Sequence, residues 1–177
     1  MKRVLVIGSG GAGKSTFARR LGERLGLPVI HLDRVYWRSG WVEPPKDEWR
    51  RQVEGLCAGR EWVMDGNYSG TLDVRLAACD AVVFLDLPRT VCVWRIIKRA
   101  LRYRGTSRPD MGEGCREQLN RDFLTFLLWV WNYPRRSRPK VLERLRALSE
   151  SRQIYILRSS AEAEEFLRGG SGQNRPR

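Results

Sequence analysis

The chain has 177 residues, 42% of them apolar, and a formal net charge of +13. This length suits one compact domain with a buried core and is too short for two ordinary domains. No apolar run approaches the roughly 18 uncharged residues of a membrane-spanning helix, and no signal-peptide cleavage site follows the amino terminus. We expect a cytoplasmic protein without a membrane partner: one domain over residues 1–168 and a disordered tail over 169–177. The charge indicates a polyanionic partner.

Short, β-branched apolar runs alternate with helical patterns along the chain. One helix is expected from Phe17, Leu21 and Leu25 on one face, closed by Gly26. The alternation predicts an α/β fold of the P-loop NTPase type, a parallel sheet with helices on both faces. We expect the strand order 2-3-1-4-5. The five expected strands are Arg3–Ile7, Pro28–Leu32, Glu61–Met64, Ala81–Leu85 and Gln153–Leu157.

About 65 residues between the fourth and fifth expected strands carry helical patterns and no strand. An insertion of that length is usually functional or mobile. We expect helices over Thr90–Tyr103, Glu113–Trp131 and Pro139–Leu148, with turns at the glycines and prolines between them. A helical lid over about residues 100–138 is the resulting prediction.

Residues 8–16 read GSGGAGKST and match G-x-x-x-x-G-K-[ST] between an expected strand and an expected helix. Glycines let the backbone turn so that several N–H groups converge on phosphate, aided by the positive end of the following helix. Lys14 is expected to reach the β and γ phosphates and Ser15 to ligate Mg²⁺. A dinucleotide loop also fits Gly8, Gly10 and Gly13 but has no use for the Lys-Ser pair. The predicted ATP-binding residues are Gly8, Ser9, Gly10, Gly11, Ala12, Gly13, Lys14, Ser15 and Thr16.

Three aspartates end expected strands, where open α/β sheets bind their ligands. Asp65 ends the strand expected beside the first, so it is our candidate for holding Mg²⁺ with Ser15. A turn aspartate before glycine is the alternative. Asp86 is the rival, but its strand lies on the far side of the first. Asp33 would stand on the acceptor side and take a hydroxyl proton, unless it only caps a helix.

Six basic residues and no acid lie between Arg95 and Arg108. Arg95 and Arg99 share a helix face, and arginines of a lid neutralise the charge that spreads over a transferring phosphoryl group. We predict a catalytic role for both, although a solvated basic face is possible. The same charge would also suit nucleic acid. Trp129, Trp131 and Tyr133 accompany it, but their spacing favours helix core over a stacking platform.

Four cysteines lack any paired spacing, and the single histidine, His31, leaves little from which to build a zinc site. Buried structural thiols are expected at Cys57, Cys79, Cys92 and Cys115. No Asn-Lys-x-Asp stretch occurs in the chain, which disfavours a GTPase.

With these motifs the chain resembles the adenylate-kinase-like P-loop kinases, most closely the bacterial DNA topology modulation proteins. The resemblance runs from Met1 to about Leu167 and rests on GSGGAGKST, LPVIHLDRVYW, WVMDGNYSGTLDVRL and WNYPRRSRP. It implies an Asp-Gly pair at Asp65, a phosphate clamp at Arg95 and Arg99, and a base-binding loop that begins at Arg158.

The adenylate kinase pattern continues Asp-Gly-Phe-Pro-Arg, whereas this chain has Asn67 and Tyr68 there, and Arg75 is the candidate replacement. The expected function is therefore transfer of a phosphoryl group from MgATP to a small acceptor, a nucleotide or a compound shaped like one. A shikimate-type or gluconate-type kinase remains an alternative because such enzymes use an aspartate at the position of Asp33. An ATP-binding regulatory protein associated with DNA topology is the other.

Overall fold

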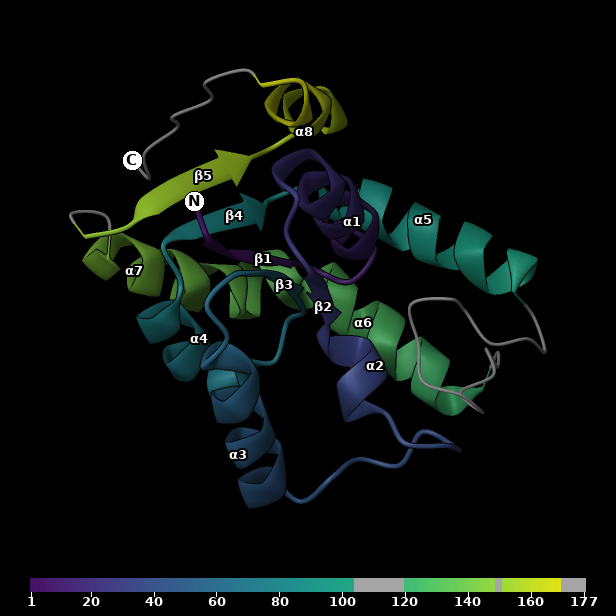
Figure 1. Cartoon of the computed structure of the whole chain (residues 1–177). Coiled ribbons are helices and arrows are strands. Elements are labelled where there is room, and N and C mark those ends of the chain that lie inside the picture. Colours follow the sequence, from purple (N-terminus) through teal and green to yellow (C-terminus); the bar gives the residue numbers. More distant parts are fainter. Residues whose placement is uncertain (104–119, 149–150, 170–177) are drawn as a thin grey trace.

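A parallel sheet forms the centre of the protein (Figure 1). The computed structural model describes residues 1–103, 120–148 and 151–169. Five strands lie in the order β2-β3-β1-β4-β5, so the strand number and order predicted from the sequence are confirmed. The strands are β1 (Arg3–Gly8), β2 (Val29–His31), β3 (Trp62–Asp65), β4 (Ala81–Leu85) and β5 (Gln153–Leu157).

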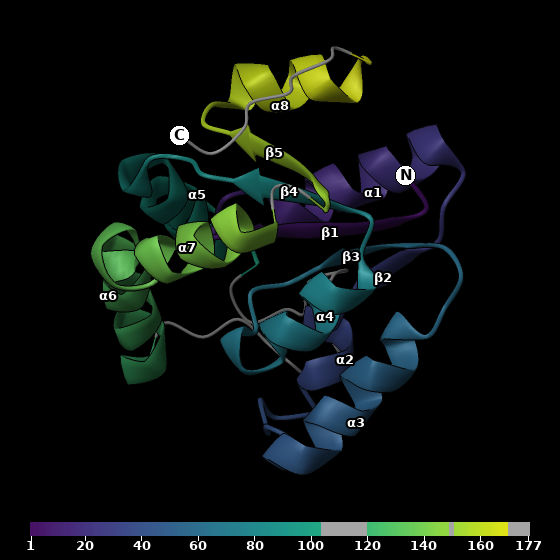
Figure 2. The same ribbon diagram turned by 90° about the vertical axis from the view of Figure 1, so that its left-hand side faces the viewer.

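Helices lie on both faces of the sheet, as Figures 1 and 2 show from two directions. A single 3₁₀ turn, Ser69–Thr71, precedes the fourth of them. The helices are α1 (Lys14–Leu25), α2 (Leu32–Tyr36), α3 (Lys46–Cys57), α4 (Leu72–Ala78), α5 (Arg89–Arg102), α6 (Arg121–Arg136), α7 (Arg138–Leu148) and α8 (Ser160–Leu167).

Alternate residues of β1 enter two apolar cores. Val4 and Val6 pack with α1, α5 and α8, whereas Leu5 and Ile7 pack with α3, α4 and α7. Successive side chains of a strand point to opposite faces, so a strand covered on both sides must be apolar throughout. This is why the central strands read as unbroken apolar runs rather than as alternating ones.

The α6 helix packs along α5 and contributes side chains to both apolar cores. Its Val130 belongs to one core and its Tyr133 to the other, and both are buried. Pro134 lies inside this helix, where the sequence had suggested a turn, and only Ser137 separates α6 from α7. Of the lid expected over residues 100–138, residues 104–119 lie outside the described part.

The sequence favoured core positions for Trp129, Trp131 and Tyr133 of α6, and this prediction is wrong for the two tryptophans. Trp129 is 38% exposed and Trp131 41%, whereas Tyr133 is buried. Trp131 carries the Arg89 guanidinium of α5 over its ring, at 4.1 Å from the centroid. Apolar side chains lie on more of the α6 surface than the core covers, so part of this apolar surface stays exposed to water.

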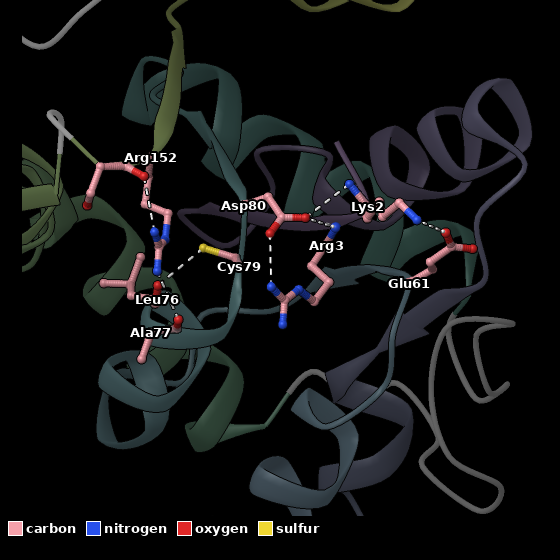
Figure 3. A network of polar contacts seen from close by, with 9 residues as sticks. Lys2, Arg3, Glu61, Leu76, Ala77, Cys79, Asp80 and Arg152 are labelled. Atoms are coloured by element: carbon pink, nitrogen blue, oxygen red, sulfur yellow. Dashed lines mark hydrogen bonds and ion pairs between the residues drawn. The ribbon is translucent and has the colours of Figure 1, made fainter.

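A polar network closes the edge of the sheet where the strands begin (Figure 3). The Asp80 carboxylate accepts hydrogen bonds from the backbone N–H groups of Lys2 and Arg3 and from the Arg3 side chain, at 2.9–3.1 Å. Arg152, just before β5, donates to the Ala77 carbonyl at 3.2 Å. These contacts fix the amino ends of β1, β4 and β5, and the carboxyl ends of the strands are left for ligands.

No helix within the described ranges is long and apolar enough to cross a bilayer. The last eight residues of the chain, which include most of the predicted disordered tail, lie outside those ranges.

Candidate active site

The glycine-rich loop between β1 and α1 is pressed against neighbouring backbone. A Cβ atom on Gly8 would lie 2.6 Å from the Leu85 carbonyl oxygen, and one on Gly11 would lie 2.2 Å from that of Cys92. Gly11 and Gly13 also have φ angles of 73° and 92°, in the left-handed region that only glycine enters freely. The loop therefore owes its shape to close backbone contact as well as to its own dihedral angles.

The outer side of this loop is covered by α6, which sequence reasoning did not foresee. A Cβ on Gly10 would meet the Phe126 ring at 2.6 Å and Val130 at 3.0 Å. Phe126 stacks on Trp129, with ring centroids 5.9 Å apart. No sequence signal links residues 116 positions apart, so this contact was accessible only from the fold. It holds the loop in place from outside.

Lys14 lies inside the loop, where its ammonium group donates to the Ser9 carbonyl at 2.9 Å. Burial lowers the pKa of Lys14 and the nearby Arg99 lowers it further, while Asp33 and Asp65 oppose the shift. The Ser9 hydroxyl is buried without a hydrogen-bond partner. A bound phosphate chain would pair with the Lys14 ammonium and would accept a hydrogen bond from the Ser9 hydroxyl. These residues fit ATP.

Asp65 connects the phosphate loop to β2. It is 3% exposed, and its Oδ2 accepts a hydrogen bond from the Ser15 hydroxyl at 2.9 Å. Its Oδ1 contacts His31 Nδ1 at 2.5 Å. Hard oxygen ligands beside a phosphate site are the chemistry that Mg²⁺ requires. Ser15 and Asp65 therefore fit the ion, and His31, whose part was not predicted, holds the carboxylate in its orientation.

Asp86, the rival carboxylate, is engaged elsewhere. Arg138 of α7 binds it through two nitrogens at 2.8–3.0 Å, and the same contact raises the pKa of Arg138. The structure thus brings Asp65, and not Asp86, to the Ser15 hydroxyl. Within the described ranges no three acidic, histidine or cysteine side chains gather closely enough to hold a metal by themselves.

Asp33 lies in the first turn of α2 and acts electrostatically on Lys14 across the crevice. Its Oδ1 accepts a hydrogen bond from the Tyr68 hydroxyl, with 2.7 Å between the two oxygens. Burial, and then the Asp33 charge, raise the pKa of Tyr68, so this hydroxyl stays a hydrogen-bond donor. The acceptor-side role of Asp33 stays a prediction.

Arg95 and Arg99 project from α5 toward the phosphate loop. Arg95 donates to the Ala12 carbonyl at 3.4 Å and to the Ser160 hydroxyl at 2.8 Å. Arg99 lies close enough to Lys14 to depress its pKa. Both guanidinium groups therefore stand beside the predicted phosphate site, and Arg95 also ties it to the loop after β5.

That loop holds Arg158, the predicted base-binding residue, whose side chain is exposed. The Arg158 N–H donates to Glu162, and Ser159 caps α8 by accepting from the Glu162 N–H at 3.1 Å. These two bonds, one to the N-cap residue Ser159 and one from the residue before it, hold the end of the loop against the first turn of α8. Thr16 is exposed on α1, away from these contacts.

Arg75 does not serve as the replacement for the adenylate kinase arginine. It is fully buried and donates to the backbone carbonyls of Gly66, Tyr68 and Thr71. Burial lowers its pKa to about 10. The guanidinium braces the segment that follows Asp65 and does not face the crevice.

Comparisons with known proteins agree with this geometry, although no family model matches the chain. Proteins named "Putative adenylate kinase" from Pyrococcus furiosus and Thermococcus onnurineus are 29% and 28% identical over 124 and 123 residues. Each alignment covers 66% of this chain and 63% of the relative's length. The chain thus spans less than two thirds of these relatives.

A solved structure of shikimate kinase from Bacteroides thetaiotaomicron matches with a TM-score of 0.52 at 16% identity. The match covers 95% of both chains. At this identity the match shows the fold alone, which is the five-stranded parallel sheet described above with helices around it.

Proposed function

We propose that the protein transfers the γ-phosphoryl group of MgATP to a small acceptor, a nucleotide or a compound of similar shape. The observation that carries the proposal is the hydrogen bond between Ser15, at the start of α1, and Asp65, at the end of β3, next to the glycine-rich loop whose Ser9 carbonyl binds the Lys14 ammonium. A carboxylate at this point serves a nucleotide–metal complex and has no purpose in a simple phosphate-binding turn. The names of the two relatives support a nucleotide acceptor.

The chain's own groups divide the work between charge and position. Lys14, Arg95 and Arg99 neutralise the phosphate oxygens, on which negative charge accumulates during transfer. Ser15 and Asp65 would hold Mg²⁺, which would supply positive charge to neutralise the phosphates. Asp33 orients the acceptor hydroxyl and receives its proton. The acceptor oxygen forms its bond to the γ phosphorus as the bond to the β-phosphate oxygen breaks, and ADP departs.

A coupled assay of ADP release tests the proposal. MgATP is offered with nucleoside monophosphates, nucleosides, shikimate and gluconate, alongside Lys14→Ala and the exposed control Lys140→Ala. We expect one acceptor to raise turnover well above hydrolysis by water. Lys14→Ala should lose at least about 100-fold of that turnover, because a charge inside the site is removed, and Lys140→Ala should retain it. Background rates with every acceptor would contradict the kinase proposal.

The second candidate is an ATP-binding regulatory protein that associates with DNA. The net charge of +13 favours it, as do the exposed arginines Arg135 and Arg136 at the end of α6. DNA binding that persists near physiological salt, with a steep salt dependence, would support this candidate. Loss of all affinity at that salt would exclude it.

A further inference from the structure

The acceptor side of the candidate site presents negative charge next to the transfer point. Asp33 is the strongest of the charged groups that raise the pKa of Lys14, followed by Asp65. Tyr68 occupies Oδ1 of Asp33, and Oδ2 makes no hydrogen bond to any described residue. A phosphate monoester carries close to two negative charges at neutral pH, so it would be repelled here unless cations compensated. A hydroxyl group, in contrast, can donate to Oδ2.

None of the six arginines of the described segment 28–75 forms a hydrogen bond or ion pair with Asp33, and Arg51 and Arg60 are exposed. Arg38 is paired with Glu48, and Arg50 with Glu54 and Asp73. Arg75 is buried against backbone carbonyls. Arg34 is exposed and lies one position after Asp33 on α2, so its side chain leaves the helix about 100° away from that carboxylate.

An aromatic cluster begins directly at Asp33 and extends toward the surface. Tyr68 packs on Tyr36 with ring centroids 4.5 Å apart, and Tyr36 on Trp37 at 4.9 Å. Trp37 in turn meets Trp41 at 5.4 Å, and Trp49 closes the cluster from the buried side. Trp37 and Trp41 remain partly exposed.

Trp41 is the only non-glycine residue with a positive φ angle in the described part of the chain, at 63°. A bulky side chain in this region is costly and persists where the surroundings require it. The bridge between Arg38 and Val42 closes a tight turn that holds the Trp41 ring against Trp37. The turn thus brings an aromatic surface to the outer end of the cluster.

We infer that the acceptor is a ring-bearing alcohol without a phosphate of its own, with the properties of a nucleoside, bound at Asp33 Oδ2 and against the partly exposed side of the cluster of Tyr36, Trp37, Trp41, Trp49 and Tyr68. This inference rests on the proposed kinase function, and of the two acceptor classes named there it selects the compound of similar shape over the nucleotide that the relatives' names support. The planar ring packs against the aromatic cluster, and the neutral sugar places its hydroxyl between Asp33 Oδ2 and the γ phosphorus. In the transfer the hydroxyl proton passes to Asp33, the new O–P bond forms, and ADP leaves with the electron pair of the broken bond. The product is a phosphate monoester, whose repulsion by Asp33 and Asp65 favours its release.

Matched pairs of acceptors test the inference, each a nucleoside and its own 5′-monophosphate, which share the ring and the sugar. With saturating MgATP we expect at least one nucleoside to have a kcat/KM at least tenfold above that of its monophosphate. Equal or better use of the monophosphates would overturn the inference while the kinase function stands. The same holds if only shikimate or gluconate is phosphorylated. If no acceptor raises ADP release, both the function and the inference fail.

Single variants separate ring recognition from chemistry. Trp37→Leu should raise the KM for the nucleoside at least about fivefold, leaving the KM for MgATP within twofold, because the ring contact lies on the acceptor side only. Trp94→Leu removes a tryptophan that is 60% exposed on α5 and should change neither constant. Asp33→Asn should lower kcat and leave nucleotide binding intact. An unchanged nucleoside KM in a folded Trp37→Leu protein would overturn the role of the cluster.

Discussion

The shape of the phosphate loop depends on glycines, where a single added Cβ atom would clash with neighbouring backbone. Gly11 combines a left-handed φ angle with a Cβ direction that is blocked by the Cys92 carbonyl of α5. A methyl group there would have to displace backbone rather than a flexible side chain. The motif glycines are therefore required by packing against α5 and α6 even before any phosphate binds.

Gly11→Ala should destabilise the protein and weaken ATP binding together. We expect the free energy of unfolding to fall by about 2–3 kcal/mol, from overpacking and from strain at positive φ. Urea unfolding of the variant measures the loss. Gly55→Ala is the matched control, because Gly55 is exposed inside α3 with nothing within 4 Å of a new Cβ. That change should stabilise the protein by up to about 1 kcal/mol. A Gly11→Ala protein as stable as wild type would contradict the packing argument.

Among the elements, the segment after β3 depends on a single buried side chain. Gly66 to Thr71 has no regular structure apart from one 3₁₀ turn, yet it positions Tyr68 against Asp33. Its carbonyls are satisfied by Arg75 of α4, which thus acts on the acceptor side without touching it. Carbonyl groups that are buried without donors are costly.

Arg75→Met keeps the length and apolar stem of this side chain but removes every donor. We expect a loss of about 3 kcal/mol in the free energy of unfolding, since three carbonyls lose a charged donor and the Tyr68 carbonyl keeps only its contact with Thr71. The Tyr68–Asp33 contact should loosen, so the KM for the acceptor should rise more than the KM for MgATP. Thermal unfolding and steady-state kinetics measure the two effects, with the exposed Arg60→Met as control. An unchanged acceptor KM would show that Arg75 does not support the acceptor site.

The sheet and the phosphate loop could be predicted because their signals are local. Apolar runs of strand length and a glycine-rich motif at the first strand–helix junction determine them within a few residues. The ends of β2 and β3 differed from expectation by one residue at each side. The pairing of Ser15 with Asp65 followed from the strand order alone, and the geometry agrees with it.

Contacts between distant segments could not be predicted. The cover of Gly10 by Phe126 and the bond between His31 and Asp65 depend on how helices and strands pack, which leaves no trace in spacing. Arg75 was misread for a related reason. It was the candidate for the arginine that the adenylate kinase pattern places after Asp65, and only the fold shows it buried among carbonyls.

At the scale of the whole molecule, the two cores bury ionisable groups that never meet a ligand. Cys57, Cys79 and Cys92 are free and buried, as the sequence predicted, while Cys115 lies outside the described residues. Cys79 is 1% exposed and donates to the Leu76 carbonyl at 3.4 Å. Burial raises the pKa of its thiol to about 11 from an ordinary 9.0, against a smaller opposing effect of Arg152.

This shift makes the stability of the protein fall in alkali. Between pH 9 and 11 the unfolded chain has released the Cys79 proton and the folded protein still holds it, so the free energy of unfolding declines as pH rises. The Cys79 contribution is complete below pH 9 and should have fallen by about 1 kcal/mol at pH 10. Arg75 acts in the opposite direction only from about pH 10 upward, where its own lowered pKa lies, so measurements at pH 8 and pH 10 largely avoid it.

Urea unfolding of Cys79→Ala under reducing conditions should show a pH-dependent loss of the free energy of unfolding that is about 1 kcal/mol smaller than that of wild type. The remaining change is common to both proteins. It combines a loss from Cys57, Cys92, Tyr36, Tyr68 and Tyr133, whose pKa burial raises, with an opposite effect of Lys14, whose pKa burial lowers. Identical losses would mean that the Cys79 thiol ionises as easily in the fold as in water, and the tight packing of the α4–β4 junction would then be wrong.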